Sequence, residues 1–300
     1  MNKVCAVVVT YNRLNMLKQC LSAISSQTVP CDLLVINNAS VDGTSEWLDS
    51  RTDQTDQTGF IHIQLQTNTG GAGGFNAGMR EAVKRGYEYI WVMDDDVLPA
   101  PDALERILEA DKLTGGRYGW LSSVTLWTDG TECKMNRQKL LKSFYQDIQL
   151  LQHGLVRAEQ ATFVSLFLKC RTVAAYGLPI RDFFIWGDDI EFTRRLAVRK
   201  ELPCYVVGKS IVTHATKNNM ESNIATDDYE RISRYKLALR NENYFFRQEG
   251  IKGFCYYFAR SGRAFLRCMR AKDHRLGRCG VVVAHVVSGL FFNPHVEMVE

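Results

Sequence analysis

Tyr89–Asp96, with the sequence Y-I-W-V-M-D-D-D, runs from five mostly apolar residues directly into three consecutive aspartates. A continuous apolar run of this length is typical of a strand that is buried on both faces of a parallel sheet. In open parallel sheets, ligands bind beyond the carboxyl ends of the strands. We therefore expect the three carboxylates to lie at a ligand-binding edge.

Earlier segments repeat this organisation. Val4–Thr10, Leu33–Ile36 and Ile61–Leu65 are apolar runs, each followed by polar or glycine-rich residues. A helical stripe of apolar residues lies between the first two runs. Further strands are expected near Trp120–Trp127, Thr162–Lys169, Tyr205–Val207 and Ser210–Thr213. The order of elements predicts an α/β fold: a Rossmann-like, mostly parallel central sheet flanked by helices.

Composition excludes several classes of protein. The 300 residues carry a net charge of only +4, which argues against a nucleic-acid partner. The nine cysteines form neither a C-x-x-C pair nor a closely spaced framework, so we expect reduced thiols in a cytoplasmic protein. The apolar run at Val4–Val9 is too short for a signal peptide, and no stretch is long enough to span a bilayer.

The three aspartates indicate a bound cation. Adjacent carboxylates raise one another's pKa unless a positive charge compensates. In an extended segment alternate side chains point the same way, so Asp94 and Asp96 would share one divalent metal while Asp95 faces elsewhere. The alternative is a helix cap, since Pro99 and Pro101 follow and carboxylates favour helix starts.

The glycine-rich segment Gly70–Gly78 does not match a dinucleotide-binding fingerprint, because Asn76 stands where the third glycine belongs. It also lacks the Gly-Lys-Ser/Thr of a P-loop. We expect a loop before a helix that runs through Glu81 and Lys84. Its glycines would either let backbone amides approach a ligand or form a flexible turn.

A second acidic group, Asp188, Asp189 and Glu191, lies where an aromatic run meets a helix. Transfer of a group to a hydroxyl needs a base, and a carboxylate within reach of the acceptor can serve. Capping of that helix is the alternative. His214 follows a strand and would be either a metal ligand or a buried, hydrogen-bonded histidine.

Together these residues resemble the family 2 glycosyltransferases of the GT-A fold, over residues 1–245. The matching motifs are Val9–Arg13, Asn38–Thr44, Asn68–Gly78, Asp94–Asp96, Gly187–Glu191, His214 and Arg240–Asn241. The resemblance implies a nucleotide-sugar-binding half at 1–115, an acceptor-binding half with the base at 116–215, and a helical, basic C-terminal region at 216–300.

The resemblance also implies roles for individual residues. Asp189 would be the base, Trp186 and Asp188 would bind the acceptor, and Asp94, Asp96 and His214 would hold Mn²⁺ or Mg²⁺. Donor contacts are expected from Thr10, Tyr11, Asn12, Arg13, Asn37, Asp42, Asn68, Gly71, Gly73, Asp94 and Asp95. Asn37 departs from the family, which commonly has aspartate there; its amide oxygen can still accept a hydrogen bond from uracil.

Within the family, the Asn68–Phe75 loop together with the full aspartate triplet is most similar to the galactofuranosyltransferases. The implied reaction is inverting transfer of galactofuranose from UDP-galactofuranose to a glycan or lipid-linked acceptor in cell-surface polysaccharide synthesis. The alternatives are a rhamnosyltransferase that uses dTDP-rhamnose and a non-catalytic sugar-nucleotide-binding assembly partner. A nucleotidyltransferase is disfavoured, because Val9–Arg13 lacks the basic glycine-rich signature of that class.

The C-terminal region concentrates the positive charge. Lys252–Arg278 contains eight basic residues and one acidic residue, interleaved with aromatic and apolar side chains. This pattern favours peripheral contact with an anionic membrane at the inner face of the cell membrane. The alternative is a solvated helical face together with a core or dimer helix.

Overall fold

The structure, a computed structural model, describes residues 3–54 and 59–300. Strands and helices alternate in its N-terminal part, in the order β1 (Val4–Thr10), α1 (Leu14–Ser25), β2 (Asp32–Asn37), α2 (Thr44–Gln54), β3 (Phe60–Gln64), α3 (Gly70–Lys84) and β4 (Tyr89–Asp94). The four strands lie where the apolar runs predict them.

The second part of the chain is less regular. It contains β5 (Val97–Pro99), α4 (Ala103–Leu113), β6 (Leu121–Trp127), β7 (Lys139–Leu140), α5 (Ile148–Gln152), β8 (Leu155–Gln160), β9 (Leu166–Lys169), α6 (Cys170–Tyr176), α7 (Asp188–Arg194) and β10 (Tyr205–His214). The two short runs expected at Tyr205–Val207 and Ser210–Thr213 form one strand, β10, whose pairing with β6 is irregular between Val207 and Ile211.

The strands form one twisted sheet in the order β3-β2-β1-β4-β9-β6-β10-β8-β7. β3, β2, β1 and β4 are parallel, whereas β9 runs antiparallel to both β4 and β6. The sheet is thus parallel in its N-terminal half and mixed beyond β4. Because β6 and β10 are parallel to each other, β10 ends at the same edge as β4. This topology brings His214 to the edge that carries the aspartates.

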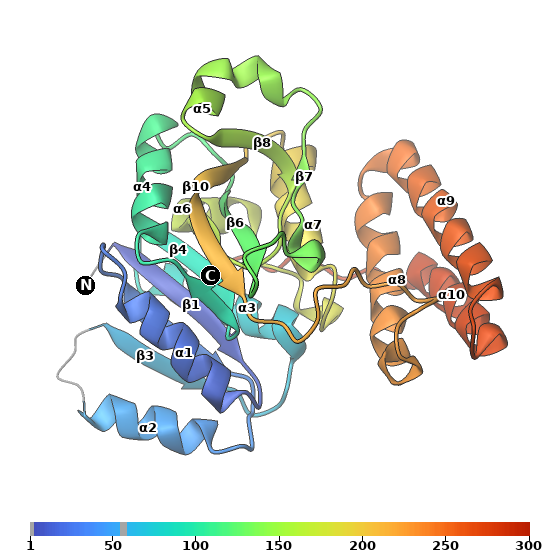
Figure 1. The fold of residues 1–300 in the computed structure, drawn as a ribbon, viewed down its shortest axis with the longest axis horizontal. Helices are drawn as coiled ribbons and strands as arrows, with labels where there is room; N and C mark the ends of the chain where they lie inside the picture. The colour runs from blue at the N-terminus through green and yellow to red at the C-terminus, as the bar shows by residue number, and fades with distance from the viewer. Residues whose placement is uncertain (1–2, 55–58) are drawn as a thin grey trace.

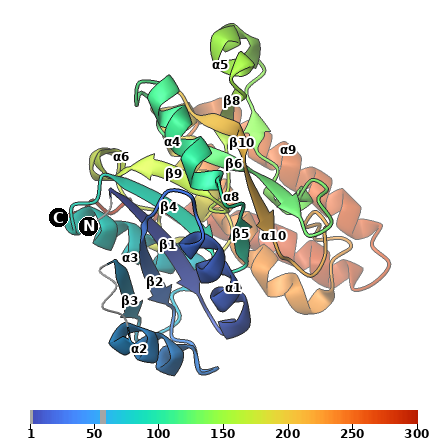
Figure 2. The ribbon, with the colours of Figure 1, turned by 60° about the vertical axis from the view of Figure 1, so that its left-hand side comes forward.

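Helices cover both faces of the sheet (Figure 2). Alternate residues of β1 point to opposite cores: Ala6 and Val8 pack with α1 and α4, and Val7 and Val9 pack with α3. Two-sided burial explains why the strand sequences are continuously apolar rather than alternating. The predicted α/β fold with flanking helices is confirmed.

The glycine-rich segment differs from the expected loop, because α3 begins at Gly70 and includes these glycines. A Cβ atom on Gly74 would collide with Val9, and one on Gly78 would collide with Val7. Glycine is a poor helix former, but here it lets α3 lie directly on β1. The glycines therefore serve mainly close helix–sheet packing.

Three helices follow the sheet: α8 (Ile232–Arg247), α9 (Gly250–Met269) and α10 (Arg275–Phe291). They form a separate helical layer beside the α/β part (Figure 1), which confirms the predicted helical C-terminal region. The last residues then return to the α/β part, where Leu178 donates a backbone hydrogen bond to Glu297 and Arg80 pairs with the Glu297 carboxylate. Within 3–54 and 59–300, no helix is both long and apolar enough to cross a membrane.

Candidate active site

A cleft of about 770 Å³ opens at the carboxyl edge of the sheet and is closed on one side by α8. Most of the residues that the sequence analysis selects line it: Thr10, Tyr11, Asn12, Arg13, Asn68, Gly71, Asp94, Asp95, Asp96, Trp186, Asp188, Asp189 and His214. Asn37, Asp42 and Gly73 lie outside the lining. The fold thus gathers side chains that are more than 200 residues apart in the sequence.

Asp94, Asp96 and His214 form the centre of the cleft. One potential ligand atom from each lies within 4.8 Å of the others. The two carboxylates are hard oxygen donors that suit Mn²⁺ or Mg²⁺, and the imidazole is a borderline nitrogen donor that binds transition metals. Among the described residues, none donates a hydrogen bond to the Asp94 carboxylate. This donor set fits a divalent cation.

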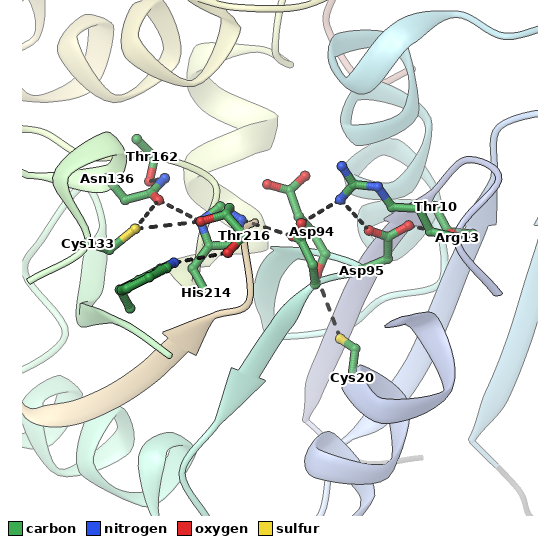
Figure 3. Close-up of polar contacts among 12 residues, drawn as sticks. Thr10, Arg13, Cys20, Asp94, Asp95, Cys133, Asn136, Thr162, His214 and Thr216 are labelled. Atoms are coloured by element: carbon green, nitrogen blue, oxygen red, sulfur yellow. Dashed lines mark hydrogen bonds and ion pairs between the residues drawn. The ribbon is translucent and has the colours of Figure 1, made fainter. Parts of the chain in front are cut away.

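His214 is oriented by hydrogen bonds on both ring nitrogens. Its Nε2 lies 2.9 Å from Asp96, and its Nδ1 lies 2.6 Å from the side-chain oxygen of Asn136 (Figure 3). Burial disfavours the charged imidazole, but the hydrogen bonds with Asp96 and Cys133 outweigh it and raise the pKa of His214 to about 10. A cation that displaced the Nε2 proton would leave Nδ1–H on Asn136, the usual arrangement of a metal-bound histidine.

Asp95 points away from this group, toward the end of β1. It accepts hydrogen bonds from the Thr10 hydroxyl at 2.7 Å and from Arg13 at 3.3 Å. Arg13 also pairs with Asp96 at 2.5 Å. Figure 3 shows Asp94 and Asp95 on the side of Thr10 and Arg13, with His214 on the other side. The expected extended segment ends at Asp94, because Asp95 and Asp96 lie in a turn between β4 and β5; this turn, rather than strand alternation, directs Asp95 away from Asp94 and Asp96.

Burial and mutual repulsion act on the carboxylates of the triplet, and positive neighbours compensate Asp96 in particular. Burial, and after it the charge of Asp96, raises the pKa of Asp94 to about 7. Burial also raises the pKa of Asp95 to about 6. Burial acts in the same direction on Asp96, but the hydrogen bond and charge of His214 and the charge of Arg13 hold its pKa below the usual value. A divalent cation would relieve this repulsion.

The second acidic group enters the cleft from the opposite wall, at the start of α7. Burial raises the pKa of Asp189 to about 6, and burial together with the charge of Asp189 raises the pKa of Asp188. A base whose pKa lies near neutrality is well suited to proton transfer. Glu191 is different: it is buried in ion pairs with Arg195 and Arg199 and lies outside the cleft lining.

The loop before α7 has an unusual backbone. Phe184, Trp186 and Gly187 all have positive φ angles, of 63°, 64° and 96°. The buried side-chain amide of Asn241 on α8 donates to the carbonyl oxygens of Phe183 and Trp186, at 3.0 and 2.8 Å. These bonds stabilise a conformation that non-glycine residues rarely adopt. Asn241, half of the Arg240–Asn241 motif, thereby positions Trp186 and the acids that follow it.

Polar loops after β1 and β2 form the remaining wall. The Asn12 backbone amide donates a hydrogen bond to the Ser40 hydroxyl. The Asn38 side-chain amide donates to the Asn68 side-chain oxygen and to the Gly70 carbonyl. Asp42 accepts from the first backbone amide of α1, at Leu14. Asn37, at the end of β2, accepts from the Ser40 backbone amide and donates to the Ser45 hydroxyl at the start of α2. For Asn37, Asp42 and Gly73, contact with a donor stays a prediction.

Several cleft residues were not anticipated from the sequence. Asn136 comes from the irregular segment between β6 and β8, which offers no periodic signal. Ser233, Arg234 and Leu237 come from α8 and line the cleft together with Asp94, Asp96 and His214. Arg234 has no hydrogen bond or ion pair with any residue in the described part of the chain. Burial, and after it the charges of Arg231 and Arg13, lower its pKa.

The known proteins to which this chain is similar are glycosyltransferases. Residues 5–147 match the family model described as Glycosyl transferase family 2. The chain is 27% identical over 265 residues to galactofuranosyltransferase GlfT1 of Mycolicibacterium smegmatis, covering 83% of this chain and 84% of that protein. It is 33% identical over 108 residues to undecaprenyl-phosphate mannosyltransferase of Micrococcus luteus, covering 36% of this chain but only 44% of that protein.

The fold is also similar to that of solved glycosyltransferases. The structure of GalNAc-T7 with UDP, GalNAc and Mn²⁺ superposes with a TM-score of 0.66 at 11% identity, over 94% of this chain and 54% of that one. At this identity the similarity concerns the fold alone. Residues 5–147 thus match glycosyl transferase family 2, and the chain as a whole has the GT-A fold.

Proposed function

We propose that the chain is an inverting, metal-dependent glycosyltransferase that moves galactofuranose from UDP-galactofuranose to a hydroxyl of a glycan or lipid-linked acceptor. The observation that carries this proposal is the placement of two acidic groups in one cleft. Asp94, Asp96 and His214 offer ligand atoms that lie close enough together to hold a cation, and Asp189 lines the same cleft from α7. The galactofuranose donor is supported by the similarity to GlfT1 over most of both chains.

The proposed reaction is a single displacement. Asp189 accepts the proton of the acceptor hydroxyl as that oxygen forms a bond to the anomeric carbon of the donor. The bond from the anomeric carbon to the diphosphate oxygen breaks, and UDP leaves with the electron pair. Asp94, Asp96 and His214 would hold the metal ion, which supplies a positive charge that stabilises the leaving diphosphate.

Other residues would bind and orient the two substrates. Thr10 and Arg13 keep Asp95 in place beside the donor, and Arg234 supplies a positive charge that suits a diphosphate. Trp186 offers an aromatic face to a sugar, next to Asp188. In this proposal residues 1–115 bind the donor, 116–215 bind the acceptor and supply the base, and 216–300 close the cleft and contact other surfaces.

A panel of donors tests the proposal. The purified protein is incubated with Mn²⁺ and with UDP-galactofuranose, UDP-galactopyranose, dTDP-rhamnose or GDP-mannose, and hydrolysis and transfer products are identified by mass spectrometry. We expect turnover of UDP-galactofuranose that is abolished by EDTA. Turnover of dTDP-rhamnose or GDP-mannose in its place would reject the donor assignment. Binding without turnover of any donor, with or without polyprenol-linked acceptors, would instead indicate a non-catalytic partner.

A further inference from the structure

α9 and α10 form a helical hairpin that packs against α8. Five residues, Arg270–His274, join the two helices, and the Cys279 thiol of α10 lies 3.9 Å from the Phe265 carbonyl of α9. The buried side of α9 carries Tyr257, whose hydroxyl donates to the Leu239 carbonyl of α8 at 2.9 Å. The hairpin therefore has one inner side, toward α8, and one outer side.

The outer side of α9 carries an apolar row at helical spacing. The row consists of Ile251, Cys255, Phe258, Gly262, Leu266 and Met269, and all six residues are exposed. Steps of three and four residues keep these side chains on one stripe of an α-helix. Ile251 is 84% exposed and Leu266 is 51% exposed, so no part of the described chain covers the row.

α10 carries a matching row, Leu276, Gly280, Val283, Val287 and Phe291, again fully composed of exposed residues. The two helices touch each other at Phe265 of α9 and Cys279 of α10. On each helix the apolar row lies next to this contact. The two rows therefore lie side by side on the side of the hairpin away from α8. We call this double row the hairpin platform.

Basic residues run along the free edge of the platform. Each of these basic residues comes one position after a member of the apolar row of α9, which rotates its side chain by about a quarter of a turn around the helix. The four residues are Lys252, Arg263, Arg267 and Arg270. None of the four has an ion-pair partner among residues 3–54 and 59–300. Neither helix contains an acidic residue, and Asp273 in the turn between them is paired with Arg278. The charge on this edge is thus uncompensated.

We propose that the hairpin platform docks on an anionic membrane surface. The apolar rows would enter the boundary between headgroups and acyl chains, while the long basic side chains reach the lipid phosphates. Charge complementarity selects this partner over a second copy of the chain. Pairing two platforms would bring two uncompensated basic edges together, and like charges repel.

The position of α8 links the platform to the reaction. One side of α8 lines the cleft with Ser233, Arg234 and Leu237, and its other side holds the hairpin. A membrane bound to the platform would therefore lie one helical layer beyond the wall of the cleft. This placement suits an acceptor whose glycan projects from a lipid. Docking itself needs no donor or turnover, so it is testable independently of the proposed reaction.

Vesicle flotation tests the electrostatic part. We expect the protein to float with vesicles of phosphatidylcholine and phosphatidylglycerol, to stay behind with phosphatidylcholine alone, and to be released by salt. R263Q/R267Q/R270Q should lower the affinity roughly 100-fold, because each basic residue near an anionic surface contributes about a factor of five. K112Q/K142Q/K209Q removes the same charge from exposed sites elsewhere and should float like the wild type.

A second pair of variants tests the apolar part. L266S removes an exposed leucine of the platform, and L140S removes one of similar exposure on β7. We expect only L266S to weaken flotation, with both variants unfolding at the wild-type temperature because both positions are at the surface. Equal loss in the two charge variants, or no binding of the wild type to anionic vesicles, would reject docking. A dimer that L266S dissociates, with flotation unchanged, would assign the platform to a second copy instead.

Discussion

The Nδ1 atom of His214 lies 2.6 Å from the side-chain oxygen of Asn136, while its Nε2 atom faces Asp96 at 2.9 Å. An amide oxygen can only accept, so Asn136 holds a proton on Nδ1. The lone pair that a metal ion needs is thereby directed from Nε2 toward Asp94 and Asp96. Asn136 also donates to the Thr162 hydroxyl at 3.1 Å, which fixes the orientation of the amide.

Replacement of Asn136 by leucine should weaken metal binding by about 10- to 100-fold, as expected for a residue that orients a metal-bound histidine. Mn²⁺ affinity in the presence of UDP, measured by calorimetry, checks this. N136D keeps an acceptor for Nδ1–H and should retain most of the affinity. T162V removes the hydrogen bond that the Asn136 amide donates and should have a small effect. Equal losses in N136L and N136D would contradict the orienting role.

Asp189→Asn should leave donor affinity nearly unchanged and lower kcat by about 10²- to 10⁴-fold, because the amide cannot accept the acceptor proton. Steady-state transfer kinetics and UDP binding measured separately distinguish the two effects. D182N is the control, since Asp182 lies before the loop that leads into α7, is exposed, and lies outside the cleft lining. Transfer by D189N at the wild-type rate would remove Asp189 from the role of base.

The pH dependence of transfer follows from the same residue. Burial raises the pKa of Asp189 to about 6, so the group is ionised and competent above that pH and protonated below it. At saturating metal and donor, kcat should be nearly constant above pH 7 and fall about tenfold per unit below pH 6. The control is the circular dichroism spectrum across this range, which should not change. A kcat that stays constant down to pH 5 would contradict Asp189 as the titrating base.

The sequence predicts the strands and the carboxylates well because both leave local signals. β1 and β4 are continuous apolar runs that end in polar residues, and the order of these runs suffices to place Asp94–Asp96 at a sheet edge. Asn136 and Arg234 leave no such signal. They reach the cleft through an irregular segment and through the docking of α8, which depend on tertiary packing rather than on periodicity.

The glycines of α3 show a different limit of sequence-based prediction. Helix propensity and turn chemistry both favour a loop at Gly70–Gly78. The helix forms nevertheless, because its close packing on Val7 and Val9 is possible only without side chains at Gly74 and Gly78. Such a packing requirement is invisible until the partner strand is known.

Gly74→Ala should therefore destabilise the protein by about 1–3 kcal/mol, because its methyl group would collide with Val9 in a closely packed core. Gly262→Ala on α9 is the matched control. No atom lies within 4 Å of a Cβ at Gly262, so this substitution should stabilise the helix by about 0.5–1 kcal/mol. Urea unfolding measures both changes. Equal and small effects would show that α3 tolerates a side chain against β1.

Arg234 lines the cleft from α8 without an acidic partner in the described part of the chain, together with the carboxylates that would hold the metal. Charge-assisted hydrogen bonds to phosphate are stronger than neutral ones. Arg234→Ala should therefore weaken UDP binding by about tenfold or more, corresponding to the roughly 1.5–3 kcal/mol of a hydrogen bond to a charged group. R234K, which keeps the charge, should recover part of the loss.

R231A is the control, because Arg231 lies one turn earlier and already pairs with Asp227 at 3.6 Å. If R234A binds UDP normally but has a raised KM for a diphosphate-linked acceptor, Arg234 belongs to the acceptor site instead. An unchanged KM for both donor and acceptor would exclude Arg234 from both binding sites.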